Sequence, residues 1–113
     1  MSADLANRVL DLRTYRLRPG VGVEFHRTFR VGALPMLERH GIDVVAYGPS
    51  LLDEDRYVLL RSFASLQERQ EQLDAFYGSR EWLDTYDEQV MSMIETYHVV
   101  VLDGAGLGAL PKG

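Results

Sequence analysis

Four stretches of the chain are predicted to be β-strands, and the first of them alternates between two faces. The first, residues 8–18 (RVLDLRTYRLR), sends successive side chains to opposite faces, and Pro19 ends it because proline has no N–H for a sheet ladder. Neither of its two faces is cleanly apolar. The other strands are predicted at residues 42–52, 57–63 and 96–103, and the short polar turn after 42–52 makes the second and third an antiparallel hairpin.

Between the first two strands the apolar period lengthens to that of a helix. Phe25, Phe29 and Ala33 recur at every fourth position, which predicts an amphipathic helix over residues 21–40. Pro35 is expected to kink or divide this helix, because proline removes a backbone donor and clashes with the preceding turn.

Small residues mark the ends of the predicted helices. Gly41 is placed to cap the C-terminus of the first helix. Ser65-x-x-Glu68 is a capping box that opens a second helix. Ser79 is placed to cap a third helix, predicted over residues 79–95.

The resulting order, β-α-β-β-α-(α)-β, predicts the ferredoxin-like arrangement of the α+β class. In it, one four-stranded antiparallel sheet carries all its helices on one face. The other face stays uncovered, so we expect a homodimer that packs sheet to sheet. The whole chain, residues 1–113, is expected to be one domain with its core at about 8–103, and the glycine-rich tail 104–113 is expected to be mobile.

Composition and charge narrow the classes of function. The net charge of −5 argues against nucleic acid or an anionic membrane as a partner, and no apolar run approaches the roughly 20 residues of a membrane span. The absence of cysteine excludes disulfides and thiolate metal sites, and it fits a cytoplasmic protein. The N-terminal stretch MSADLANRVLDL has no basic head followed by a long apolar run, so no signal peptide is expected.

The charge is unevenly distributed. Residues 1–30 carry six arginines against Asp4, Asp11 and Glu24, a local balance of +3, which leaves −8 for the remainder. These arginines either form a positive face for an anion or an acidic partner, or belong to a solvated face balanced by nearby acids.

Several motifs in this order resemble the NIPSNAP family. The sequence LDLRTYRLRPG is similar to the opening strand and turn of the family, and LPMLERHGIDVVAY is similar to its helix end and next strand. Ser65-Leu66 with Arg69 matches the S-L-x-x-R helix, and SREWLDTY resembles a later Glu-Trp segment. The resemblance covers roughly residues 8–103, with Asp11 where glutamate is usual and Arg61 where an aromatic residue is expected.

The resemblance implies a dimeric α/β barrel more than it implies a reaction. The wider superfamily includes cofactor-free monooxygenases, haem-degrading enzymes and stress-response barrels, and its ligands bind between helix and sheet. Many bacterial members have no assigned activity. Eleven arginines against one lysine fit a bacterial chain.

His98 and Asp11 are the candidate catalytic residues, because an ionisable group near neutral pH can act as a base. A small-molecule cavity is predicted, since aromatic rings with polar tips suit a flat ligand. Its expected lining is His26, Arg13, Tyr15, Tyr47, Arg61 and Trp82. The alternative is that these aromatic residues only form the core and the dimer interface.

Three functional hypotheses therefore stand side by side. The chain is a NIPSNAP-like dimer that binds a small molecule or a protein partner, a cofactor-free oxygenase or isomerase acting on an aromatic compound, or a haem-binding barrel that uses His26. We expect no metal site, because no H-x-x-x-H or H-E-x-x-H spacing occurs, and no cofactor under the first two hypotheses.

The helices need an apolar sheet face to pack against, and this requirement predicts which face of the first strand they cover. On that basis Leu10, Leu12 and Thr14 are expected to pack against the helices. Asp11 and Arg13 would then face the dimer partner, with Arg13 as an interface residue.

Overall fold

The computed structural model describes residues 5–107, and within them one antiparallel sheet carries the fold. Its strands are β1 (Val9–Leu17), β2 (Asp43–Pro49), β3 (Arg56–Phe63) and β4 (Ile94–Asp103). They lie in the order β2-β3-β1-β4, and every neighbouring pair is antiparallel. This is the ferredoxin-like α+β arrangement that the sequence predicts.

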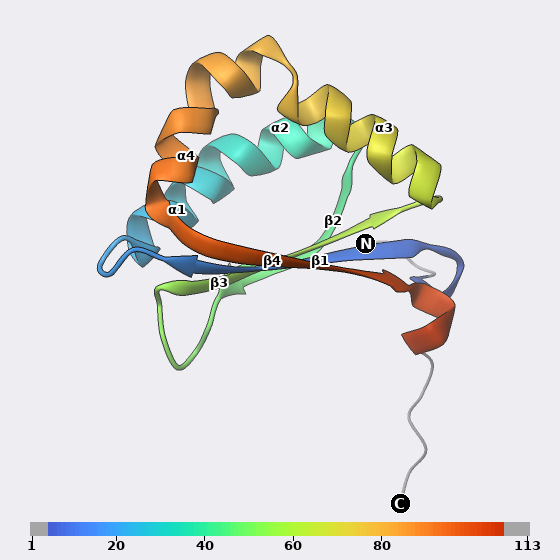
Figure 1. Ribbon diagram of the computed structural model, residues 1–113, viewed down its shortest axis with the longest axis horizontal. Helices are drawn as coiled ribbons and strands as arrows, with labels where there is room; N and C mark the ends of the chain where they lie inside the picture. The colour runs from blue at the N-terminus through green and yellow to red at the C-terminus, as the bar shows by residue number, and fades with distance from the viewer. Residues whose placement is uncertain (1–4, 108–113) are drawn as a thin grey trace, which may run out of the picture.

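The helices lie on one face of this sheet, and the opposite face is bare of helices (Figure 1). Two short 3-10 turns, η1 (Leu5–Asn7) and η4 (Gly104–Leu107), lie before β1 and after β4. The helical segments are α1 (Gly22–Thr28), η2 (Phe29–Ala33), α2 (Leu34–Arg39), α3 (Leu66–Tyr77), η3 (Trp82–Tyr86) and α4 (Asp87–Met93). No helix in residues 5–107 is long and apolar enough to cross a membrane.

Two of the helical segments, η2 and η3, are π-helical. The predicted helix over 21–40 is thus divided into α1, η2 and α2, with Pro35 in the first turn of α2. Phe25, Phe29 and Ala33 are all buried, so the predicted apolar stripe is confirmed. The backbone continues without a break from η2 into α2, because Ala33 and Leu34 both keep helical dihedral angles.

The predicted helix ends are confirmed in detail. Gly41 has a φ of 74°, in the left-handed region that favours glycine after a helix. The Ser65 hydroxyl accepts a hydrogen bond from the Glu68 backbone N–H at 3.0 Å, and the Ser79 hydroxyl accepts one from Trp82 N–H at 3.2 Å. The tail differs from the prediction in its first four residues, which form η4; residues 108–113 lie outside the described part of the chain.

The expected orientation of β1 is wrong. The bond from Arg69 of α3 to Asp11 places Asp11 and Arg13 toward the helices. By alternation, Leu10, Leu12 and Thr14 point to the other side of the sheet, not toward the helices as expected. The apolar surface that the helices require comes largely from β3, where Tyr57, Leu59 and Phe63 are buried in the core. The antiparallel register ties the odd positions of β1 to the same face as these residues.

Candidate functional site

A cluster of charged side chains lies beneath α3, centred on Asp11. The Asp11 side chain is completely buried. Its Oδ1 accepts hydrogen bonds from Arg13 Nε at 3.3 Å and from Arg61 Nη2 at 3.2 Å, and its Oδ2 accepts one from Arg69 Nε at 2.8 Å. The cluster therefore joins β1, β3 and α3 through one carboxylate.

Three guanidinium groups keep this carboxylate ionised. Burial by itself would raise the pKa of Asp11, but the charges of Arg61 and Arg13 and hydrogen bonds from Arg69 and Arg61 outweigh it, so the pKa is lowered. A carboxylate with a lowered pKa is a poor proton acceptor near neutral pH. Asp11 is thus suited to hold the arginines in place rather than to act as a general base.

Tyrosines hold two of the arginines from the other side. Arg61 Nη1 donates to the Tyr77 hydroxyl at 3.1 Å. The Arg13 guanidinium lies 5.6 Å from the ring centre of Tyr77 and 6.0 Å from that of Tyr97, within the range of cation–π attraction. Among the described residues, Arg61 Nε is the one buried side-chain nitrogen or oxygen without a hydrogen-bond partner.

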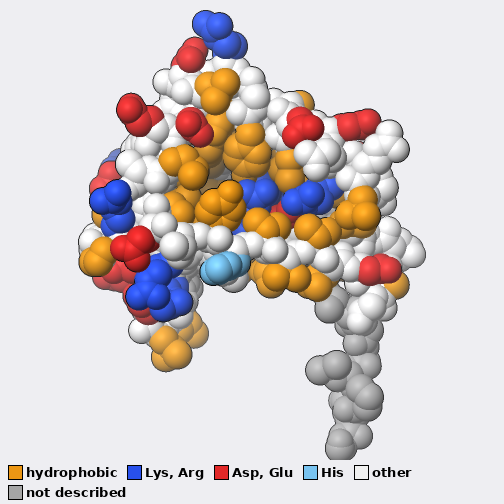
Figure 2. All heavy atoms as spheres, in the orientation of Figure 1, with side chains coloured by type: hydrophobic (Ala, Val, Ile, Leu, Met, Phe, Trp, Pro, Cys, Tyr) orange, Lys and Arg blue, Asp and Glu red, His pale blue; other side chains and the backbone are white. Residues whose placement is uncertain are grey.

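Beside this cluster an open hollow of about 320 Å³ lies between the helices and β4. It is lined by Arg13, Tyr77, Trp82, Asp87, Met91 and Tyr97. Trp82 Nε1 donates to Asp87 Oδ1 at 3.0 Å, which fixes the indole at the start of η3. Figure 2 shows Lys and Arg side chains at the bottom of a depression between the helices and the sheet, framed by hydrophobic side chains.

A smaller apolar cavity of about 30 Å³ adjoins the hollow and shares Tyr77 and Trp82 with it. Tyr15, Phe25 and Phe29 are among its other lining residues. Its volume is close to the space of one water molecule. Burial raises the pKa of Tyr15, which keeps this phenol neutral at physiological pH.

His26 and Tyr47 lie in the same layer between helices and sheet, around Tyr57. His26 Nδ1 is 2.7 Å from the Tyr57 hydroxyl, and the rings of His26 and Tyr47 are 6.1 Å apart. Burial raises the pKa of Tyr57, so its hydroxyl stays protonated and can donate to His26. Because Nδ1 contacts Tyr57, Nε2 is the His26 nitrogen left to bind iron under the haem hypothesis.

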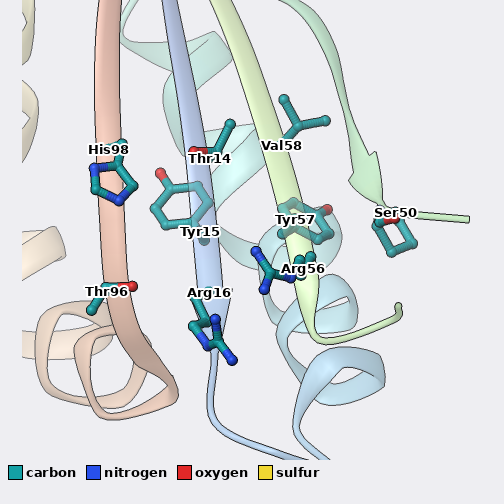
Figure 3. A pocket seen from close by; sticks show the side chains of 10 residues that line it. Thr14, Tyr15, Arg16, Ser50, Arg56, Tyr57, Val58, Thr96 and His98 are labelled. Atoms are coloured by element: carbon teal, nitrogen blue, oxygen red, sulfur yellow. The ribbon is translucent and has the colours of Figure 1, made fainter. Parts of the chain in front are cut away.

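His98 lies on the opposite face of the sheet from Asp11. It pairs with Thr14 across β1 and β4, and it lines an open hollow of about 510 Å³ with Arg16 and Arg56. Figure 3 shows His98, Thr14 and Val58 side by side on β4, β1 and β3. The two candidate catalytic residues are thus separated by the sheet and cannot act together within one chain.

The predicted cavity residues fall into two groups. Arg13, Tyr15, Arg61 and Trp82 are brought together in or beside the charged cluster, whereas His26 and Tyr47 gather around Tyr57. No group of three histidine, aspartate or glutamate side chains in residues 5–107 is placed to hold a metal ion.

Three residues of the site, Arg69, Tyr77 and Asp87, were absent from the predicted set. Arg69 and Tyr77 lie four residues on either side of the buried Leu73, so they share its face of α3. That spacing is visible in the sequence. Asp87 had no comparable signal, because its partner is the indole of Trp82.

A family model described as NIPSNAP matches residues 10–103. The chain belongs to the NIPSNAP family. No curated protein matches it. Membership of the family does not by itself assign an activity to this chain.

Several solved structures share this fold at low sequence identity. An uncharacterized NIPSNAP-like domain protein from Burkholderia xenovorans matches with a TM-score of 0.78 and 16% identity, over 86% of this chain and 84% of that chain. A NIPSNAP family protein from Agrobacterium tumefaciens matches with a TM-score of 0.77 and 18% identity, over 84% and 90%. A second from that organism, described as of unknown function, matches with a TM-score of 0.78 and 19% identity, over 90% and 92%.

Proposed function

We propose that this NIPSNAP chain binds a small molecule in the hollow beside β4 and functions as a homodimer. The observation that carries the ligand proposal is the composition of the hollow, in which three aromatic rings and a methionine surround one arginine. Concave sites with apolar walls and a few polar groups are the usual form of a small-molecule site.

The exposure of these side chains supports a binding role over a role in the core. Tyr97 is 47% exposed and Met91 is 45% exposed, although both are large apolar residues next to a buried core. Trp82 is buried on its core side and also lines the hollow. A flat ligand would cover apolar surface that is otherwise left in water.

The homodimer proposal rests on the bare face of the sheet. Leu12 pairs with Leu60 on one side and with Val100 on the other, and Ala46 follows beyond Leu60. These four residues form a continuous apolar row across all four strands, on the face that carries no helix (Figure 1). Two copies of this row would bury each other.

We also propose that the protein is bacterial and cytoplasmic. The similar solved structures come from Burkholderia and Agrobacterium, and arginine exceeds lysine by 11 to 1. The absence of cysteine fits a reducing compartment.

Ligand binding can be tested by fluorescence, because Trp82 is the one tryptophan of the chain. Titration with benzamide and with benzoate should change its emission in a saturable way. Tyr97→Ala removes an exposed wall of the hollow and should weaken the response about tenfold. Val31→Ala, at an exposed helix position outside the hollow, should leave it unchanged. An emission that neither compound changes would contradict the ligand proposal.

A further inference from the structure

We infer that the ligand of this hollow is an aromatic monocarboxylate whose carboxylate pairs with Arg13. The inference rests on the proposed small-molecule function and specifies the chemical class of the ligand. It depends on the charge balance around Asp11, on the position of Arg13 in the hollow, and on the rings that surround Arg13.

The cluster beneath α3 carries more positive than negative charge. Arg13, Arg61 and Arg69 form ion pairs with the single carboxylate of Asp11, which leaves an excess of +2. In the described part of the chain no second carboxylate forms an ion pair with any of these three arginines. Asp87 also lines the hollow, where it accepts the indole N–H, and it reduces the local excess to +1.

This excess is held in a poorly solvated place. Arg61 is fully buried, and the side chains of Arg13 and Arg69 are only 14% and 17% exposed. Uncompensated charge in such a place is costly, so an added anion would be stabilised by the cluster. One extra negative charge matches the remaining +1 better than the two charges of a phosphate do.

Arg13 is the arginine that can reach the anion, because it lines the hollow whereas Arg61 and Arg69 do not. Its bond to Asp11 uses Nε, and its side chain also hydrogen-bonds to Tyr15. A guanidinium carries five N–H donors, so these two bonds leave terminal N–H groups for a ligand. The rings of Tyr77 and Tyr97 flank the guanidinium and hold its plane. A planar fork fixed in this way suits a carboxylate, which has two oxygens in one plane.

The walls of the hollow specify the rest of the ligand. Trp82, Tyr97 and Met91 offer apolar surface beside Arg13, within a volume of about 320 Å³. A single aromatic ring that bears a carboxylate would place its ring against these side chains and its charge at the arginine.

The test compares benzoate with benzamide, which has nearly the same shape and no charge. We expect benzoate to bind the wild-type protein about tenfold more tightly than benzamide does, as measured by Trp82 fluorescence and by amide chemical shifts around the hollow. This ratio needs no variant. Equal affinities would overturn the carboxylate inference and leave the proposed function standing, whereas binding of neither compound would overturn both.

Substitutions at Arg13 test whether this residue causes the preference for benzoate over benzamide. Arg13→Gln should abolish the preference for benzoate, and Arg13→Lys, which keeps the charge without the fork, should retain part of it. Arg80→Gln is the matched control, because Arg80 is 92% exposed and pairs with Asp84 outside the hollow. A preference that survives Arg13→Gln would contradict the assignment. Inorganic phosphate is the third probe, and phosphate binding tighter than that of benzoate would overturn the carboxylate class.

Discussion

Asp11 determines how the arginines of the site are arranged. It is fully buried and accepts hydrogen bonds from side chains of three elements. Without its charge, Arg61 would remain buried with no ion-pair partner, since the other hydrogen bond of its side chain goes to the hydroxyl of Tyr77. A buried cation without a partner is far more costly than the ion pair is stabilising.

Asp11→Asn should therefore destabilise the protein strongly. By analogy with other broken buried pairs we expect a loss of about 3–5 kcal/mol in the free energy of unfolding, measured with urea at pH 7. Asp84→Asn, at an exposed ion pair, should cost much less. Similar losses in the two variants would contradict the structural role of Asp11.

The same residue gives a pH dependence whose sign follows from its lowered pKa. A lowered pKa in the folded state contributes stability above the ordinary pKa of about 3.9, and this contribution is lost as the pH falls through the folded pKa. The difference in stability between wild type and Asp11→Asn should thus narrow as the pH is lowered from about 5 toward 2. A difference that stays constant over this range would contradict the lowered pKa.

At the scale of elements, the two π-helical segments meet at a glycine. Gly32 lies in η2, and a Cβ added there would lie 2.5 Å from Cε1 of Tyr86 in η3. Tyr86 ends η3, and Trp82, which lines the hollow, begins it. The close approach of η2 and η3 therefore fixes the segment that carries a wall of the site.

Gly32→Ala should push the Tyr86 ring away and lower the free energy of unfolding by about 1–3 kcal/mol, the usual cost of overpacking. In a Tyr86→Ala background the same substitution should cost little, because the space is then free. Thermal unfolding of the four proteins of this cycle measures the coupling. Additive effects would show that the two segments do not restrict each other.

The first helical region shows which features of an element can be predicted from the sequence. The stripe of Phe25, Phe29 and Ala33 predicted a helix, and the structure confirms its buried face. The same stripe does not reveal that η2 is π-helical. A π-helix closes its hydrogen bonds one residue further along the chain than an α-helix does, and three buried positions spaced by four residues fit either form.

At the scale of the whole molecule, the apolar row on the bare face is the basis for the proposed dimer. The residue of β1 that lies on this bare face is Leu12. Arg13, which was expected at the dimer interface, faces the helices. Leu12 lies between Leu60 and Val100 in the middle of the row. A charge at this position would enter the centre of the proposed interface.

Leu12→Glu should convert the proposed dimer to a monomer, because burying an unpaired carboxylate in an apolar contact is costly. Sedimentation equilibrium at micromolar concentration would show the mass fall from two chains to one. Val31→Glu, at an exposed position on the helical side, should leave the dimer intact. A wild-type protein with the mass of one chain would contradict the homodimer.

The sequence by itself determined the order of the elements, the fold class and the family, because these depend on periodicity, turn residues and motif order along the chain. It also named Arg13, Tyr15, Arg61 and Trp82, which lie in or beside the charged cluster, and His26 and Tyr47, which lie around Tyr57. Only the tertiary structure decided which face of β1 is buried. Alternation defines two faces without ranking them, and neither face of this strand is clearly apolar. Asp11 could turn inward because Arg61 and Arg69, distant in the sequence, neutralise it there.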